Sequence, residues 1–134
     1  MKKITYLLLF TMLCSFTSHA QFPETFDTEI PATWAVFSGL NGEGPTYTWV
    51  HNSFGYILCQ WEAATEGTTT EDWLVSPLTP ITTTTSLLTF DQTDYWAQDY
   101  SSSYTVRIST TSQTDITSFT TVDTQGETSV SNGV

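Results

Sequence analysis

The sequence predicts an all-β fold, built as a sandwich of two antiparallel sheets. Short segments of alternating apolar and polar residues recur along the chain, and clusters of Gly, Pro, Asn and Ser separate them. This combination is typical of strands joined by turns. No stretch carries apolar residues at the spacing of an amphipathic helix, so little helix is expected. Aromatic residues make up 14% of the chain, which supplies bulky side chains for the space between two sheets.

The segment 71–77, Glu-Asp-Trp-Leu-Val-Ser-Pro, is the predicted strand around which the others are organised. Trp73 is expected on one side of this strand and Asp72 on the other, because successive side chains alternate. The same alternation places Glu71 and Asp72 on opposite sides of the strand, which argues against a joint role of the two acids in catalysis. Pro77 has no N–H for a β-ladder, so the strand should end there or lie at a sheet edge.

Further strands are predicted from the same alternation, and turns or loops separate them. In the segment 104–109, the apolar side chains are expected on one face and the polar ones, including Arg107, on the other. The turn at 52–55 should reverse the chain, and 112–118 is a predicted loop. The complete set of further strands is 33–38, 46–50, 56–61, 87–91, 104–109 and a short candidate at 119–122, with Trp34, Trp49 and Trp73 assigned to the core.

Residues 1–20 have the features of a secretory signal peptide. Lys2 and Lys3 precede an apolar run, and small residues stand at the positions that a signal peptidase reads before Ala20. The apolar run is too short to cross a bilayer with its flanks. We therefore expect export, cleavage after Ala20, and one secreted or cell-surface domain over residues 21–134 without membrane insertion.

The cleaved chain is strongly acidic. Arg107 remains as the one Lys or Arg against fourteen Asp and Glu. Such a chain repels nucleic acids and anionic lipids, so neither is an expected partner. In the simplest interpretation the acids serve solubility. The alternative is that a few of them converge on a hard cation such as calcium.

Motifs for catalysis are scarce. Cys59, the only Cys after cleavage, cannot form an internal disulfide, and its apolar segment predicts a buried, unreactive thiol. His51, the only His after cleavage, is expected in a loop or on the surface, and no Gly-x-Ser-x-Gly motif accompanies it. We therefore expect no enzyme activity, with a fragment of a secreted hydrolase as the alternative. Lipidation at Cys14 is disfavoured by the bulky Leu13.

Aromatic residues beside polar loops are the candidate ligand-binding residues. Aromatic rings stack on sugar rings, while acids and amides can bond the sugar hydroxyls. A glycan or a cell-surface protein is therefore the expected partner. The alternative is a structural spacer in which all aromatic side chains are buried. The candidates are Trp61, Tyr95, Trp96 and Tyr100.

The order of the motifs resembles that of the cleaved-adhesin and choice-of-anchor J domains, which are modules of secreted Bacteroidetes proteins. The matching segments span roughly residues 22–123. They are Phe26-Asp27, Ile30-Pro31-Ala32-Thr33-Trp34-Ala35-Val36, Asn41-Gly42 to Trp49, Glu71-Asp72-Trp73-Leu74-Val75-Ser76-Pro77, Leu88-Thr89-Phe90 and Tyr104-Thr105-Val106-Arg107-Ile108-Ser109-Thr110. The combination of segments is specific to this family, whereas each segment alone is weak evidence for it.

The resemblance implies a jelly-roll sandwich of the MAM or galactose-binding type, which binds surfaces, proteins or glycans without catalysis as an accessory to a larger protein. It also implies a structural calcium ion near Asp27, where several relatives carry a Glu. Asn41, Glu43 and Asp99 are candidate additional ligands because they are acidic or amide side chains in predicted loops. The family normally continues with more strands, so we expect this domain to be incomplete at its C-terminus.

Overall fold

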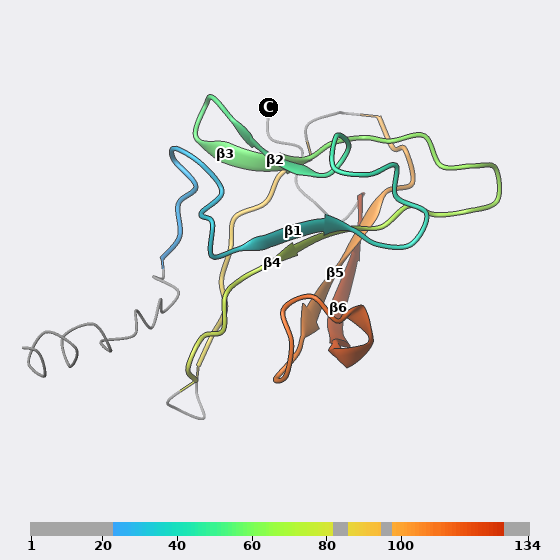
Figure 1. Ribbon diagram of the computed structural model, residues 1–134. Coiled ribbons are helices and arrows are strands. Elements are labelled where there is room, and N and C mark those ends of the chain that lie inside the picture. Colours follow the sequence, from blue (N-terminus) through green and yellow to red (C-terminus); the bar gives the residue numbers. More distant parts are fainter. Residues whose placement is uncertain (1–22, 82–85, 95–97, 128–134) are drawn as a thin grey trace, which may run out of the picture.

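The computed structural model describes residues 23–81, 86–94 and 98–127 (Figure 1). The predicted signal peptide, 1–20, lies outside these ranges, as do the candidate ligand-binding residues Tyr95 and Trp96.

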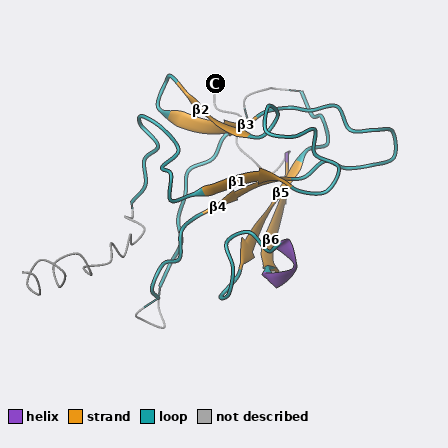
Figure 2. Ribbon diagram, in the orientation of Figure 1, coloured by secondary structure: helices purple, strands orange, loops and turns teal. Residues whose placement is uncertain are grey.

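The described residues form an all-β structure, as predicted. The strands pair as three antiparallel two-stranded sheets, β1–β4, β2–β3 and β5–β6, and the described helix content is one 3₁₀ turn (Figure 2). Among the described residues these three pairs are not hydrogen-bonded into larger sheets, so the two-sheet sandwich stays a prediction. The elements are β1 Ala35–Ser38, β2 Trp49–Asn52, β3 Tyr56–Cys59, β4 Asp72–Val75, β5 Ser103–Ile108, η1 Ile116–Ser118 and β6 Thr120–Gly126.

The central pair joins segments that are far apart in the sequence. β1 lies antiparallel to β4, with Phe37 directly opposite Trp73. Aromatic side chains at facing positions of two strands pack on one another, which stabilises the pair. β4 ends at Val75, shortly before Pro77, as the missing N–H of proline predicts.

The β2–β3 hairpin forms around the predicted turn. Asn52 accepts a hydrogen bond from the backbone N–H of Phe54 at 2.9 Å through its side chain, and its carbonyl oxygen accepts one from Gly55 at 3.0 Å. Gly55 has a φ of +83°, a backbone conformation that suits glycine. The predicted strand 46–50 begins only at Trp49, because the N–H of Tyr47 closes a turn onto Gly44 at 3.1 Å.

A β-bulge shifts the register of the β5–β6 pair. Val106 is opposite Asp123 and Arg107 is opposite Thr121, so Val122 is an extra residue in β6. Beyond the bulge, Ile108 is 56% exposed while Arg107 is half-buried. The face of β5 that carries Arg107 is therefore not the more exposed one at this end of the strand.

The predicted strand at 87–91 is not formed. Leu87 is 85% exposed and Leu88 is 61% exposed, and the segment has no strand assignment. An alternating sequence becomes a strand only where a second strand accepts its backbone hydrogen bonds. Phe90 instead packs edge-on against Tyr104, with ring centroids 6.4 Å apart. The predicted loop at 112–118 contains η1.

Trp73 is the centre of the described core. It is 8% exposed, and its ring stacks on Phe37 at 5.9 Å and meets Phe119 edge-on at 5.2 Å. The Arg107 guanidinium lies 4.8 Å from the centre of the Trp73 ring and forms an ion pair of 3.3 Å with Glu71. These contacts join the β1–β4 pair to the β5–β6 pair. They also show Glu71 on the side of β4 that carries Trp73.

The other two tryptophans assigned to the core, Trp34 and Trp49, are half-buried. The ring of Trp34 meets Phe26 edge-on at 4.9 Å. The Trp49 Nε1–H donates to the backbone oxygen of Asp72 at 3.2 Å, which links β2 to β4. The core prediction is therefore confirmed fully for Trp73 and in part for the other two.

Candidate functional site: exposed aromatic residues and a buried acid cluster

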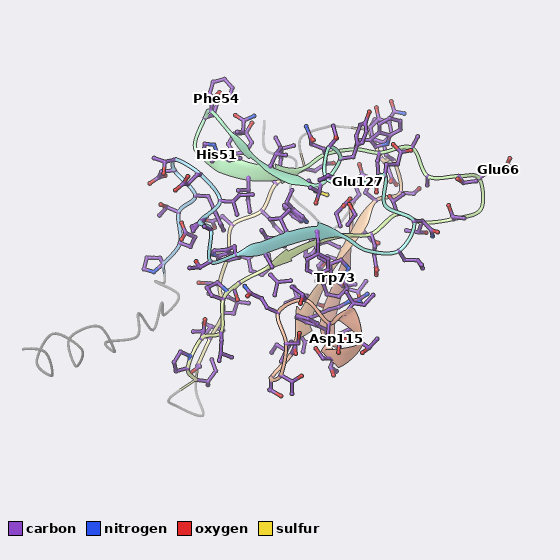
Figure 3. All side chains as sticks on the ribbon, viewed as in Figure 1. His51, Phe54, Glu66, Trp73, Asp115 and Glu127 are labelled. Carbon is purple, nitrogen blue, oxygen red and sulfur yellow. The ribbon has the colours of Figure 1, made fainter. Side chains whose placement is uncertain are left out.

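The tip of the β2–β3 hairpin presents two aromatic rings. Phe54 is 84% exposed and projects from the turn, and its ring stacks on Tyr56 with centroids 6.5 Å apart (Figure 3). The hydrogen bond from the Phe54 N–H to Asn52 fixes the turn that carries the ring. The sequence analysis missed Phe54, although it predicted this turn. An aromatic residue within a tight turn lies beyond both strands, so its position in the turn predicts that it is exposed.

Trp61 lies just after β3 and is 73% exposed. Its neighbour Glu62 is only 7% exposed and accepts a hydrogen bond of 2.6 Å from the backbone N–H of Glu43. The N–H of Gln60 donates to the carbonyl oxygen of Thr48 at 3.1 Å. Trp61 is therefore an exposed ring on a backbone that is fixed on both sides.

Tyr100 is 52% exposed and stands on a loop that one carboxylate organises. Oε2 of Glu127 accepts hydrogen bonds from the N–H of Tyr100 at 2.8 Å and of Ser102 at 2.9 Å. Asp99 accepts one from the N–H of Ser101 at 2.7 Å. Ser101 has a φ of +62°, which turns these N–H groups toward the two acids. Glu127 was not selected from the sequence, because no local pattern links it to a loop so far away.

A second group of side chains lies between the β1–β4 pair and the β2–β3 hairpin. Four polar side chains, which we call the acid cluster, meet here. Asp72 is the central member, since the charge of Glu62 and the hydroxyls of the other two members act on its carboxyl group. The acid cluster consists of Ser38, Thr48, Glu62 and Asp72.

Burial of Asp72 raises the pKa of its carboxyl group, and the negative charge of Glu62 raises it further, while the Ser38 and Thr48 hydroxyls oppose the shift. One buried oxygen atom on each of the four side chains is left without a partner among the described residues. The arrangement therefore concentrates oxygen atoms and negative charge without neutralising either.

Cys59 lies at the edge of the acid cluster. Its sulfur is 4.0 Å from Oδ2 of Asp72. The residue is exposed, contrary to the predicted burial. Protein atoms still surround the thiol, and this burial, followed by the charges of Asp72 and Glu62, raises its pKa to about 12. A thiol that holds its proton this tightly is a poor nucleophile, in agreement with the predicted low reactivity.

The predicted calcium ligands are dispersed. No group of three or more His, Cys, Asp or Glu within 23–81, 86–94 and 98–127 is arranged to hold a metal ion, so Asp27, Glu43 and Asp99 do not meet in one site. Asp27 accepts a hydrogen bond from Thr25 at 2.8 Å, and its backbone lies beside the hairpin turn at Gly55. The side chain of Asn41 donates to Thr69 at 3.1 Å. Glu43 reaches the acid cluster through its backbone N–H.

His51 lies within β2 rather than in the predicted loop. Its Nε2 is buried and has no hydrogen-bond partner among the residues described. No serine and carboxylate are arranged around it in the described hydrogen bonds.

No family model matches the chain, and no curated protein or solved structure matches it. The resemblance to the choice-of-anchor J domains therefore stays a prediction. Within the described ranges, no helix has the length and apolar character of a membrane span.

Proposed function

We propose that this chain is a secreted, non-catalytic binding module that holds a glycan or a cell-surface protein against exposed aromatic rings. The observation that carries the proposal is the exposure of Phe54, Trp61 and Tyr100, at 84%, 73% and 52%. Each ring is carried by backbone that hydrogen bonds hold in place. An exposed ring on a fixed backbone loses little conformational entropy when a ligand stacks on it.

The charge of the chain favours a neutral ligand. The full sequence has a formal net charge of −11, and acidic side chains, Glu62 and Glu127, support the backbone beside Trp61 and Tyr100. Sulfated or sialylated glycans would be repelled by this charge. Neutral sugars offer apolar ring faces for stacking and hydroxyls that can donate hydrogen bonds to carboxylates. We therefore favour neutral glycans over acidic ones.

The two-sheet jelly-roll sandwich and the kinship with choice-of-anchor J domains belong to the same proposal. Two contacts support it. The Trp49 indole bonds the backbone of β4, and Arg107 of β5 packs on Trp73 of β4. Through these contacts the β2–β3 pair and the β5–β6 pair both contact β4, and packed layers of sheet require such contacts. A role as accessory domain of a larger exported protein completes the proposal.

A panel of neutral and acidic glycans, together with peptides, tests the function. We expect neutral glycans to shift the tryptophan fluorescence, and Trp61→Ala or Phe54→Ala to weaken that binding. Leu78→Ala is the matched control, because Leu78 is 79% exposed but has no ring. Equal weakening by the Leu78 variant would indicate non-specific hydrophobic adhesion.

Three other outcomes would replace the proposal. Absence of binding to every glycan and peptide would leave a structural spacer, and binding that persists after removal of all three rings would place the ligand elsewhere on the chain. Turnover of a glycan or peptide that is lost in His51→Ala would favour the hydrolase.

A further inference from the structure

The acid cluster occupies the junction between two sheets. Ser38 ends β1 and Asp72 begins β4, and the two residues are paired in the ladder. Thr48 and Glu62 come from the two segments that flank the β2–β3 hairpin. The Trp49 indole bonds the Asp72 carbonyl across the junction at 3.2 Å. Side chains from both sheets therefore converge on one place.

Two members of the acid cluster are almost fully buried and lack partners for their oxygen atoms. Thr48 is 5% exposed and Glu62 is 7% exposed. Their Oγ1 and Oε1 atoms, together with Oγ of Ser38 and Oδ1 of Asp72, accept no hydrogen bond among the described residues. Buried polar atoms in folded proteins are nearly always paired, so a set of four that converge calls for a ligand that binds oxygen.

Among the residues that the structure describes, no Lys or Arg is paired with either of the two carboxylates. The chain has three Lys and Arg. Two of them are Lys2 and Lys3, within the predicted signal peptide. The third, Arg107, is paired with Glu71 at 3.3 Å, on the Trp73 side of β4. A cation that neutralises Glu62 and Asp72 would therefore come from solution.

We infer that the acid cluster binds one hard divalent cation, with calcium as the first candidate. The Glu62 and Asp72 carboxylates would supply the charge, the Ser38 and Thr48 hydroxyls would add neutral oxygens, and water would complete the shell. Calcium takes six to eight oxygen ligands in a flexible geometry, whereas zinc prefers nitrogen and sulfur. The proposed ligands are two carboxylates and two hydroxyls, and no group of three or more His, Cys, Asp or Glu among the described residues is arranged to hold a metal ion.

Binding at this place would have a defined structural consequence. The cation would link β1 and β4 to both ends of the hairpin, and it would fix Glu62 next to the exposed Trp61. Oε2 of Glu62 already accepts the N–H of Glu43 at 2.6 Å, so only its other oxygen would turn to the cation. This inference does not depend on the proposed glycan binding.

The test uses the full chain after treatment with EDTA, titrated with calcium chloride by calorimetry and with terbium by luminescence. Terbium replaces calcium and emits when a nearby indole absorbs, and the Trp49 indole lies beside Asp72. We expect one ion per chain, tryptophan-sensitised emission that calcium displaces, and a melting temperature that rises with calcium.

Variants locate the ion. Glu62→Gln, Asp72→Asn and the nearly isosteric Thr48→Val should each weaken binding by roughly tenfold or more, since even outer-shell partners of metal sites typically matter by 10–100-fold. The exposed Glu66→Gln is the matched control and should bind as the wild type does. Circular dichroism without calcium checks that each variant is folded.

Three outcomes would overturn the inference. Absence of binding at millimolar calcium would mean that Glu62 and Asp72 share a proton instead. Binding that survives in folded Asp72→Asn would place the ion elsewhere. Binding that is lost in Asp27→Ala, but not in Asp72→Asn, would place it at the site expected from the family resemblance.

Discussion

Arg107→Met removes the guanidinium that contacts Trp73 and Glu71 and keeps most of the aliphatic bulk of the side chain. The guanidinium lies 4.8 Å from the Trp73 ring centre, a cation–π contact that contributes about 1 kcal/mol when partly desolvated. The ion pair with Glu71 joins side chains that are 28% and 35% exposed, so it adds only about 0.5 kcal/mol. The expected loss of stability is therefore about 1.5 kcal/mol. For a domain near 100 residues this lowers the melting temperature by about 6 °C.

Thermal unfolding followed by circular dichroism measures this loss, and a double-mutant cycle with Glu71→Gln separates the two contributions. The coupling of Arg107 to Glu71 should decrease at high salt, because salt screens exposed charges, while the contact with Trp73 should persist. Thr120→Met is the control, since it adds a similar side chain at an exposed position of the same sheet. An Arg107→Met protein that melts with the wild type would refute the view that Arg107 joins the sheets.

Three further predictions follow from single contacts. Gly39→Ala should destabilise the fold by about 1–3 kcal/mol, because the new Cβ would lie 2.6 Å from Nε1 of Trp73 and overpack the core. Gly126→Ala is the control, since a Cβ there meets open space, and its stability in chemical denaturation should be nearly that of the wild type. Cys59 has a folded-state pKa of about 12, so its alkylation at pH 8 should be at least roughly a hundredfold slower than in the denatured chain. Since its pKa is raised on folding, stability should decline as pH rises from about 9 toward 12, and pH-independent stability over that range would contradict this cause. Glu127→Ala removes the acceptor of two backbone N–H groups, so hydrogen exchange at Tyr100 and Ser102 should become faster. Exchange in the β2–β3 hairpin should stay unchanged. Equal exchange rates at Tyr100 and Ser102 in the variant and the wild type would show that Glu127 does not hold this loop.

Local sequence patterns predicted most of the strands because they depend on neighbouring residues only. Alternation identified the strands that contain Phe37 and Trp73, and the Asn and Gly of the turn at 52–55 identified the hairpin. Local pattern failed at 87–91, where an apolar segment has no partner strand among the described residues. It also did not predict the bulge at Val122, because a bulge arises from the pairing of two strands and leaves no mark in either one alone.

The candidate site was predictable only in part. Trp61 and Tyr100 were selected from their position beside polar loops and are exposed. The acid cluster was not selected, and Asp72 was considered only for catalysis. Its members lie at positions 38, 48, 62 and 72, in four separate segments, and no spacing rule connects them.

By itself, the sequence determined an acidic chain of short strands with one central Trp-containing strand, since strand alternation, turn chemistry and charge are properties of the local chain. The tertiary structure alone decided that β1 pairs with β4, that Arg107 lies over Trp73 and that two carboxylates and two hydroxyls share a buried junction. The physical reason is that pairing and convergence depend on backbone hydrogen bonds and packing between distant segments, which the residues of one segment do not specify.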